Sequence, residues 1–113
     1  MQKLSLDAAA REHLELARGN GAARSSATVY GGHEHALRQT VVALAAGAGL
    51  SEHENPGEAT VHVLIGRVRL SANGNDWDGR PGDLLVIPDA RHTLQAIEDA
   101  AVLLTVVPRA HIR

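Results

Sequence analysis

The stretch His53–Gly66, HENPGEATVHVLIG, decides the fold class of this chain. Apolar residues recur in it at every second position, and successive side chains of a β-strand point to opposite faces. The aliphatic side chains on one face are those of Ala59, Val61, Val63 and Ile65. We therefore expect a half-buried strand that turns this face to a core and turns His62 outward.

The rest of the chain from Thr28 onward also has a sequence pattern typical of β-strands. Short runs rich in Val, Leu and Ile are separated about every eight to twelve residues by Gly, Pro, Asn or Asp, which is typical of an antiparallel sandwich or small barrel. We expect strands at 37–46, 58–65, 67–72, 75–78, 83–88, 91–97 and 101–107, with a weaker one near 27–30.

The N-terminal residues have a different period. Apolar side chains recur at helical spacing at Leu6, Ala10, Leu14 and Ala17. Ser5 or Asp7 can cap the start of this helix, and the sequence GNG ends it. We expect an all-β protein of one domain, with a short N-terminal helical segment over residues 1–24 and an antiparallel β-sandwich or barrel over residues 25–113.

Composition excludes several functions. The 113 residues carry a net charge of −2 and no cysteine, which argues against nucleic-acid binding, disulfides and Cys-ligated zinc. No apolar run approaches the roughly 20 residues of a membrane span. We expect a soluble cytoplasmic protein that binds neither nucleic acid nor membrane. With no Phe, one Tyr and one Trp, its core consists of Val, Leu, Ile and Ala.

One hairpin can be registered from the sequence. In RVRLSANGNDWDG, the Asn73-Gly74 pair suits a two-residue type I′ turn, because both residues tolerate positive φ. This register predicts Leu70 opposite Trp77 on the inner face. It also predicts an outer pair, Arg69 opposite Asp78.

Two sequence motifs with glycine, histidine and proline at fixed spacings overlap the expected strands. The first contains Gly47, His53 and Gly66, and the second, GDLLVIPDARH, contains Gly82, Pro88 and His92. Over residues 37–107 the chain resembles the cupin family, whose members are small jelly-roll β-barrels. The resemblance implies a divalent first-row metal ion as cofactor, held by two His, a Glu or Gln, and a final His.

The metal-binding positions of that pattern are half filled. His53 matches the first His and His92 the last, whereas Asn55 stands at the second His and Ala59 at the carboxylate. Mutating a residue that only hydrogen-bonds to a metal ligand costs about 10–100-fold in metal affinity. Losing two of the four ligands themselves should cost more, so we expect a degenerate metal site, one that no longer binds a metal ion tightly. Metal binding by His53 and His92 remains the alternative.

Alternation along RHTLQAI places His92 and Leu94 together on an inward face. The expected small-molecule pocket is lined by His53, Asn55, Val61, Val63, His92 and Leu94. Gln39 joins it if its face of the strand points inward, and otherwise Arg38 and Thr40 do. His33 and His35 are either solvated at a glycine turn or complete a site with His53 or His92.

Three functions follow. The first is a cupin-type barrel that binds a small molecule. The second, implied by the resemblance, is a metal-dependent enzyme of the dioxygenase or isomerase type that uses His53 and His92. The third is a non-catalytic dimerisation or regulatory module. A homodimer is expected, with outward apolar residues such as Leu64 in its interface. The sequence assigns no catalytic residue.

Overall fold

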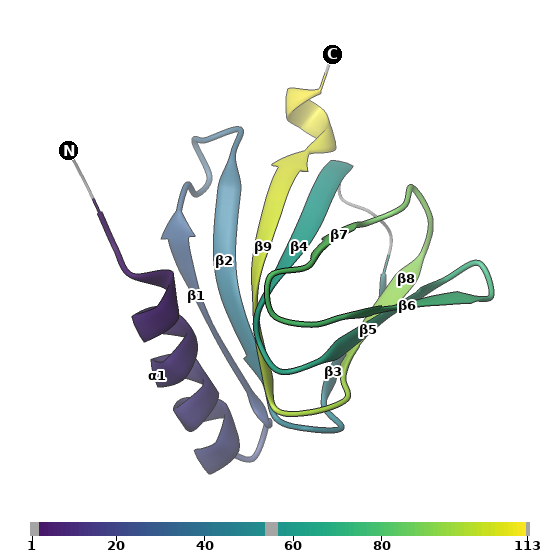
Figure 1. Cartoon of the computed structure of the whole chain (residues 1–113). Helices are drawn as coiled ribbons and strands as arrows, with labels where there is room; N and C mark the ends of the chain where they lie inside the picture. The colour runs from purple at the N-terminus through teal and green to yellow at the C-terminus, as the bar shows by residue number, and fades with distance from the viewer. Residues whose placement is uncertain (1–2, 54–56, 113) are drawn as a thin grey trace.

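A computed structural model of the chain describes residues 3–53 and 57–112, without the side chains of residues 51–53. The described part contains one α-helix, nine strands and a 3₁₀ turn (Figure 1). In chain order they are α1 (Leu6–Gly19), β1 (Arg24–Tyr30), β2 (Arg38–Leu44), β3 (Gly49–His53), β4 (Gly57–Ile65), β5 (Val68–Ala72), β6 (Asn75–Gly79), β7 (Leu84–Val86), β8 (His92–Ala96), β9 (Ala100–Pro108) and η1 (Arg109–His111).

The strands form two sheets. One has the order β1-β2-β9-β4-β7 and the other β3-β8-β5-β6, and neighbouring strands in both are antiparallel. The two sheets face each other, and α1 lies on the outer side of the five-stranded sheet (Figure 1). The expected antiparallel sandwich with a short N-terminal helix is confirmed. Within the described ranges, no helix is long and apolar enough to cross a membrane.

Alternate residues of both sheets fill one shared interior layer. In β4, Ala59, Val61 and Val63 are buried in this layer, as the alternation predicts. Ile65 is an exception, because the pairing of β4 with β9 shifts between Val63 and Ile65. A bulge of this kind re-aims the residues that follow it. Ile65 and Leu64 both pack beside α1, so the expectation that Leu64 offers a free outer surface is wrong.

Helix α1 begins where the sequence predicts. The Ser5 hydroxyl accepts a hydrogen bond from the Ala8 amide at 3.1 Å, which makes Ser5 the N-cap. Ala10, Leu14 and Ala17 are the buried face of the helix. They pack on two further alanines, one in β2 and one in β9. Small side chains on both partners let the helix approach the sheet closely.

A carboxylate fixes the other end of α1. Asp99 precedes β9, and one of its oxygens accepts from Arg18 Nε of the helix at 2.7 Å. The second oxygen accepts from the Ala46 amide, in the loop after β2, also at 2.7 Å. Asp99 therefore joins the helix, the β2–β3 loop and the β8–β9 loop.

The predicted hairpin is confirmed in its turn and register. Asn73 has φ of 54° and Gly74 of 76°, as a type I′ turn requires. Leu70 pairs with Trp77, and Arg69 pairs with Asp78. Trp77 is 43% exposed, however, because β6 is the edge strand of its sheet. The apolar pair is thus buried on one side only.

Strand β3 is absent from the sequence-based expectation. Its residues, GLSEH, contain a single aliphatic side chain and no alternation. It is a strand because it pairs with β8, where Leu50 lies opposite Leu94 and His53 opposite His92. Strand β1 is also longer than the weak strand expected near 27–30.

We expect Val63→Ala to lower the free energy of unfolding by about 2 kcal/mol, because Val63 is fully buried and its truncation leaves a cavity. The neighbouring substitution His62→Ala removes a half-buried outward side chain and should change stability by about 0.5 kcal/mol or less. Urea denaturation of both variants checks this. Equal losses of stability would contradict the assigned faces of β4.

Candidate functional site

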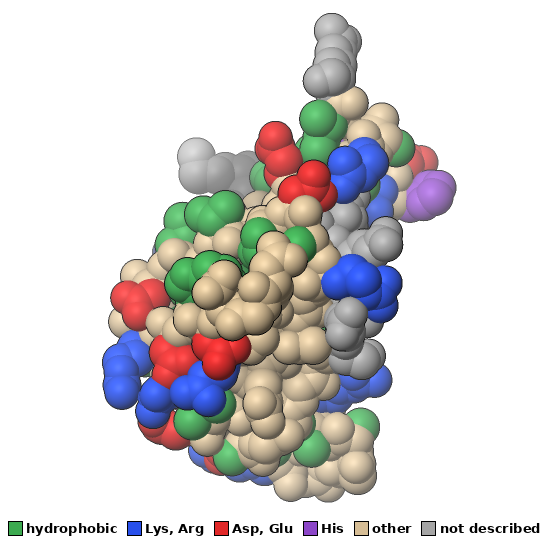
Figure 2. Space-filling view, turned by 90° about the vertical axis from the view of Figure 1, so that its right-hand side faces the viewer, with side chains coloured by type: hydrophobic (Ala, Val, Ile, Leu, Met, Phe, Trp, Pro, Cys, Tyr) green, Lys and Arg blue, Asp and Glu red, His purple; other side chains and the backbone are tan. Residues whose placement is uncertain are grey.

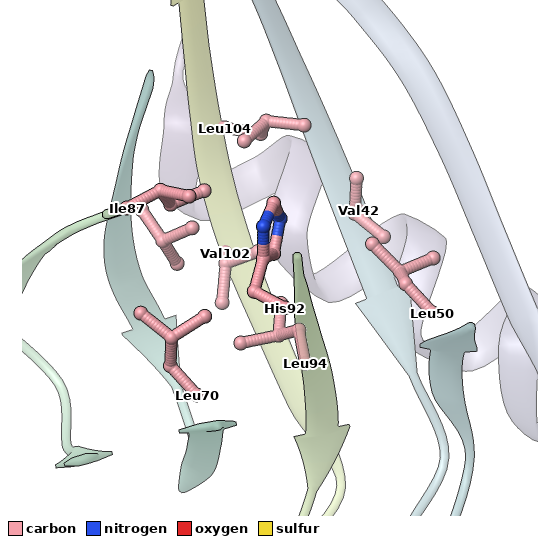
Figure 3. A pocket seen from close by; sticks show the side chains of 9 residues that line it. Val42, Leu50, Leu70, Ile87, His92, Leu94, Val102 and Leu104 are labelled. Atoms are coloured by element: carbon pink, nitrogen blue, oxygen red, sulfur yellow. The ribbon is translucent and has the colours of Figure 1, made fainter. Parts of the chain in front are cut away.

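A small hollow lies in the interior layer between the two sheets (Figure 3). Its volume is about 20 Å³, which is room for one water molecule. Strands of both sheets and the segment after β7 supply its walls. The lining residues are Val42, Leu50, Val61, Leu70, Ile87, His92, Leu94, Val102 and Leu104. Apart from His92, this wall is aliphatic.

His92 is the polar feature of the hollow. It opens β8, is 3% exposed, and is the one buried polar side chain among the residues whose burial is described. Its ring projects between the aliphatic side chains of both sheets (Figure 3). Nδ1 lies 3.1 Å from the carbonyl oxygen of Ala90. Because a carbonyl only accepts, Nδ1 is the donor in this hydrogen bond.

The two other polar residues of the expected pocket fall in or beside the part that is not described. The backbone of His53 lies directly opposite that of His92 in the β3–β8 ladder. The His53 side chain and the whole of Asn55 lie outside the described residues. Convergence of the two imidazoles therefore stays a prediction, and the backbone register supports it.

The expected apolar residues divide into three groups. Val61 and Leu94 line the hollow. Val63 is fully buried in the same layer but does not reach the hollow. Gln39 points to the opposite face of β2, where its amide nitrogen donates to the Thr105 hydroxyl at 3.2 Å. Placing Gln39 in this pocket is thus corrected, and Val42 of the same strand occupies the inward side.

The sequence did not predict most of the other residues that line the hollow, because pairing between distant strands brings them together. Leu50 belongs to the unpredicted β3, and Val102 and Leu104 lie on the inward side of β9. Alternation along AVLLTVV could have suggested the β9 residues. Nothing local indicates that they share one hollow with Leu70 of the opposite sheet.

The described residues do not by themselves supply the metal site that the cupin pattern implies. Ala59, at the carboxylate position, is a buried methyl group in the interior layer. Among the described residues, no three His, Cys, Asp or Glu side chains lie together as metal ligands would. The described lining of the hollow supplies one imidazole, whereas a usual first-row metal site has three or more protein ligands.

His33 and His35 lie in the loop between β1 and β2. The His35 ring meets the Tyr30 ring edge-on with centroids 5.4 Å apart. The Arg38 guanidinium donates to the backbone carbonyls of both His33 and His35 at 3.3 Å. Neither histidine lines the hollow, so the expectation that they complete its site gains no support.

An open groove adjoins the hollow beside the β5–β6 turn. It has a volume of about 460 Å³ and is lined by Ser71, Ala72, Asn73, Gly74, Arg91, His92 and Thr93. His92 lines both spaces. The groove has a mixed polar and apolar lining, whereas the hollow is mainly apolar, and His92 contributes to both.

The perturbed carboxylates lie away from this site. Hydrogen bonds from Arg69 and then from Arg67 hold the pKa of Asp78 far below its usual range. For Asp99, the Ala46 amide and then Arg18 lower the pKa of the carboxyl. Both groups bind their partners on the surface of the fold, and neither lines the hollow. They stabilise the fold and supply no charge to the site.

The chain belongs to the cupin family, because the sequence profile of the cupin domain matches residues 40–108. No curated protein matches it. A conserved protein of unknown function from Streptococcus pyogenes is similar in structure, with a TM-score of 0.68, 29% identity, and coverage of 75% of this chain and 74% of that one.

Two further structures share the fold. A Cupin 2 conserved barrel domain protein from Salinispora arenicola has a TM-score of 0.70 at 17% identity, over 99% of this chain and 92% of that one. KdgF from Halomonas sp. has a TM-score of 0.63 at 23% identity, over 80% of this chain and 85% of that one. At these identities the likeness concerns the fold alone.

We expect Asp99→Asn to lower stability at neutral pH and to flatten its acid dependence. The folded pKa of Asp99 lies below the unfolded value of about 3.9, so its stabilisation is present above that pH and is lost as the pH falls through the folded pKa. Urea midpoints from about pH 6 down to about pH 3 measure this. The exposed helix carboxylate of Glu12, changed to Gln, is the control. Parallel pH profiles for Asp99→Asn and the native chain would contradict the assignment.

Proposed function

We propose that this cupin binds a small molecule at the mouth of its barrel, with His92 as the polar contact. The observation that carries the proposal is a buried imidazole in an otherwise aliphatic wall. Burying a polar ring among methyl groups costs free energy unless hydrogen bonds compensate it. Leu70 and Leu94 fill neighbouring positions without that cost, so packing alone gives no reason for a histidine here.

The size of the hollow restricts the ligand. A space of about 20 Å³ admits one water molecule or a group of similar size. A larger molecule has to place most of its atoms in the adjoining groove of about 460 Å³. The proposed ligand therefore has a short apolar group for the hollow and a polar remainder beside Ser71 and Thr93. The His92 ring, which lines both spaces, is the polar group that such a ligand would meet between them.

A metal-dependent enzyme is the second candidate. One observation favours it, namely the backbone of His53 opposite that of His92. The buried methyl group of Ala59 and the aliphatic wall oppose it, because they offer a metal ion no oxygen or nitrogen ligand. The described residues fit an organic ligand better than a metal ion.

We expect His92→Leu to weaken ligand binding and to stabilise the fold. The probe is 2-methylpropan-1-ol, titrated against protein with labelled Leu and Val methyl groups. Saturable NMR shifts should appear at Leu70, Leu94 and Leu104 in the native chain. Losing one hydrogen bond should weaken binding up to about tenfold. The free energy of unfolding should rise by about 1 kcal/mol.

The matched control is Gln95→Leu, which changes an exposed side chain on the other face of β8 and should leave the binding unchanged. Equal affinity of the native and His92→Leu proteins for the alcohol would overturn the role of His92. Absence of any saturable methyl shift in the native chain would overturn the pocket itself.

Metal analysis separates the two candidates. We expect protein purified without a histidine tag and dialysed against EDTA to keep its melting temperature, because the described walls supply one imidazole only. Adding Co²⁺ or Zn²⁺ should then leave that temperature unchanged. One metal ion per chain that survives purification, together with a lower melting temperature after its removal, would favour the metal-dependent enzyme.

A further inference from the structure

We propose that a groove between β1 and β3 binds the carboxylate of a short aliphatic acid, with Arg24 as the contact for the charge. The groove has a volume of about 380 Å³ and is lined by Ala22, Arg24, Ser25, Ser26, Val42 and Leu50. Ligand sites in proteins commonly have volumes of about 300–1,000 Å³. This Arg24 groove shares no described lining residue with the groove beside the β5–β6 turn, so the inference goes beyond the proposed function.

Strand β1 places polar side chains on the face that is aliphatic in the neighbouring strand. Ser26 pairs with Val42 in the β1–β2 ladder. Arg24 pairs with Leu44, and both partners in β2 are buried in the interior layer. Residues directly opposite each other in an antiparallel pair lie on the same face. Arg24 and Ser26 therefore face the side of the second sheet, yet both are exposed, because that sheet ends at β3 and does not cover β1 (Figure 1).

Two aliphatic side chains form the other side of the Arg24 groove. Val42 comes from β2 and Leu50 from β3, and the two lie together on one side of the His92 ring (Figure 3). Both also line the hollow, so they stand between the hollow and the groove. A ligand in the groove can thus pack an aliphatic tail on Val42 and Leu50 without entering the hollow of about 20 Å³.

Arg24 supplies a positive charge that the fold leaves available. Other arginines, such as Arg18 and Arg69, bind an aspartate. Basic and acidic side chains also lie against each other on the face of the molecule in Figure 2. Among the described residues, no ion pair holds the Arg24 guanidinium and no carboxylate lines its groove. The planar guanidinium matches both oxygens of a carboxylate, so an organic acid is the ligand that this group suits best.

The backbone around Arg24 is held in place. The side-chain amide of Asn20, at the end of α1, donates to the Arg24 carbonyl at 2.9 Å. The Ala45 amide, after β2, donates to the Ala23 carbonyl at 2.9 Å. These bonds attach the start of β1 to the helix end and to the β2–β3 loop. A fixed backbone lowers the entropy that binding has to remove.

Strand geometry limits the length of the ligand. Ser26 lies opposite Val42, with about 4.5–5.5 Å between Cβ atoms in such a pair. Arg24 lies two residues before Ser26 on the same face, or about 7 Å along the strand. A carboxylate bound to Arg24 can therefore carry a tail of about three to five carbons onto Val42.

A charged probe and its neutral counterpart test the proposal. We expect 3-methylbutanoate to give saturable NMR shifts at the Val42 and Leu50 methyl groups of the native chain. Arg24→Gln should weaken this binding about three- to fivefold at pH 7 and low salt, and about 0.15 M salt should reduce the difference. 3-Methylbutan-1-ol has the same tail without the charge, so it should bind the native and Arg24→Gln proteins equally.

Two further variants serve as controls. Arg11→Gln removes an exposed arginine of α1 outside the groove and should leave binding of the acid unchanged. Arg24→Lys keeps the charge without the planar guanidinium and should bind the acid with intermediate affinity. Equal affinity of the native and Arg24→Gln proteins for the acid, or equal losses for acid and alcohol, would rule out Arg24 as the carboxylate contact.

The same titrations separate this groove from the hollow. His92→Leu should leave binding of 3-methylbutanoate unchanged, because His92 does not line the Arg24 groove. Loss of acid binding in His92→Leu together with no effect of Arg24→Gln would place the acid in the hollow and contradict the proposal. The native chain would also contradict it by showing no saturable shift at Val42 and Leu50. Failure of the alcohol at Leu70, Leu94 and Leu104 concerns the hollow alone.

Discussion

The two sheets are held together by aliphatic side chains that alternate strands point into one shared layer. Each buried Val or Leu contributes roughly 1.5–3 kcal/mol, against a net stability of about 5–15 kcal/mol for a domain of this kind. The layer contains no Phe, and Trp77 remains partly exposed at its edge. Small branched side chains pack closely, so a hollow of only about 20 Å³ is left among them. The described interior hollow therefore has room for about one water molecule.

His92 is the place where this packing is interrupted. His92 stands at the last histidine position of the cupin pattern. Ala59 stands at the position of the metal-binding carboxylate, and its methyl group is buried in the core. A hydrogen bond to the Ala90 carbonyl orients the His92 ring. At these two positions the structure therefore has a buried imidazole and a packed methyl group.

The outer face of the five-stranded sheet has two halves with different environments. Helix α1 covers one half through contacts between small residues, Ala10 and Ala17 on the helix and Ala43 and Ala101 on the sheet. Asp99 fixes the helix end on that side. Strand β7 and its neighbours form the other half, which no described element covers.

The sequence by itself determined what depends on neighbours along the chain: the start of α1, the turn at Asn73-Gly74, the inward faces of β4 and β8, and the cupin frame. Alternation and turn chemistry are local, so these features can be read without coordinates. Only the tertiary structure decided that GLSEH is a strand, that a bulge turns Ile65 toward the helix, and that Gln39 faces away from the hollow. Those outcomes depend on pairing between distant strands, and the hollow exists only where six such strands bring their side chains together.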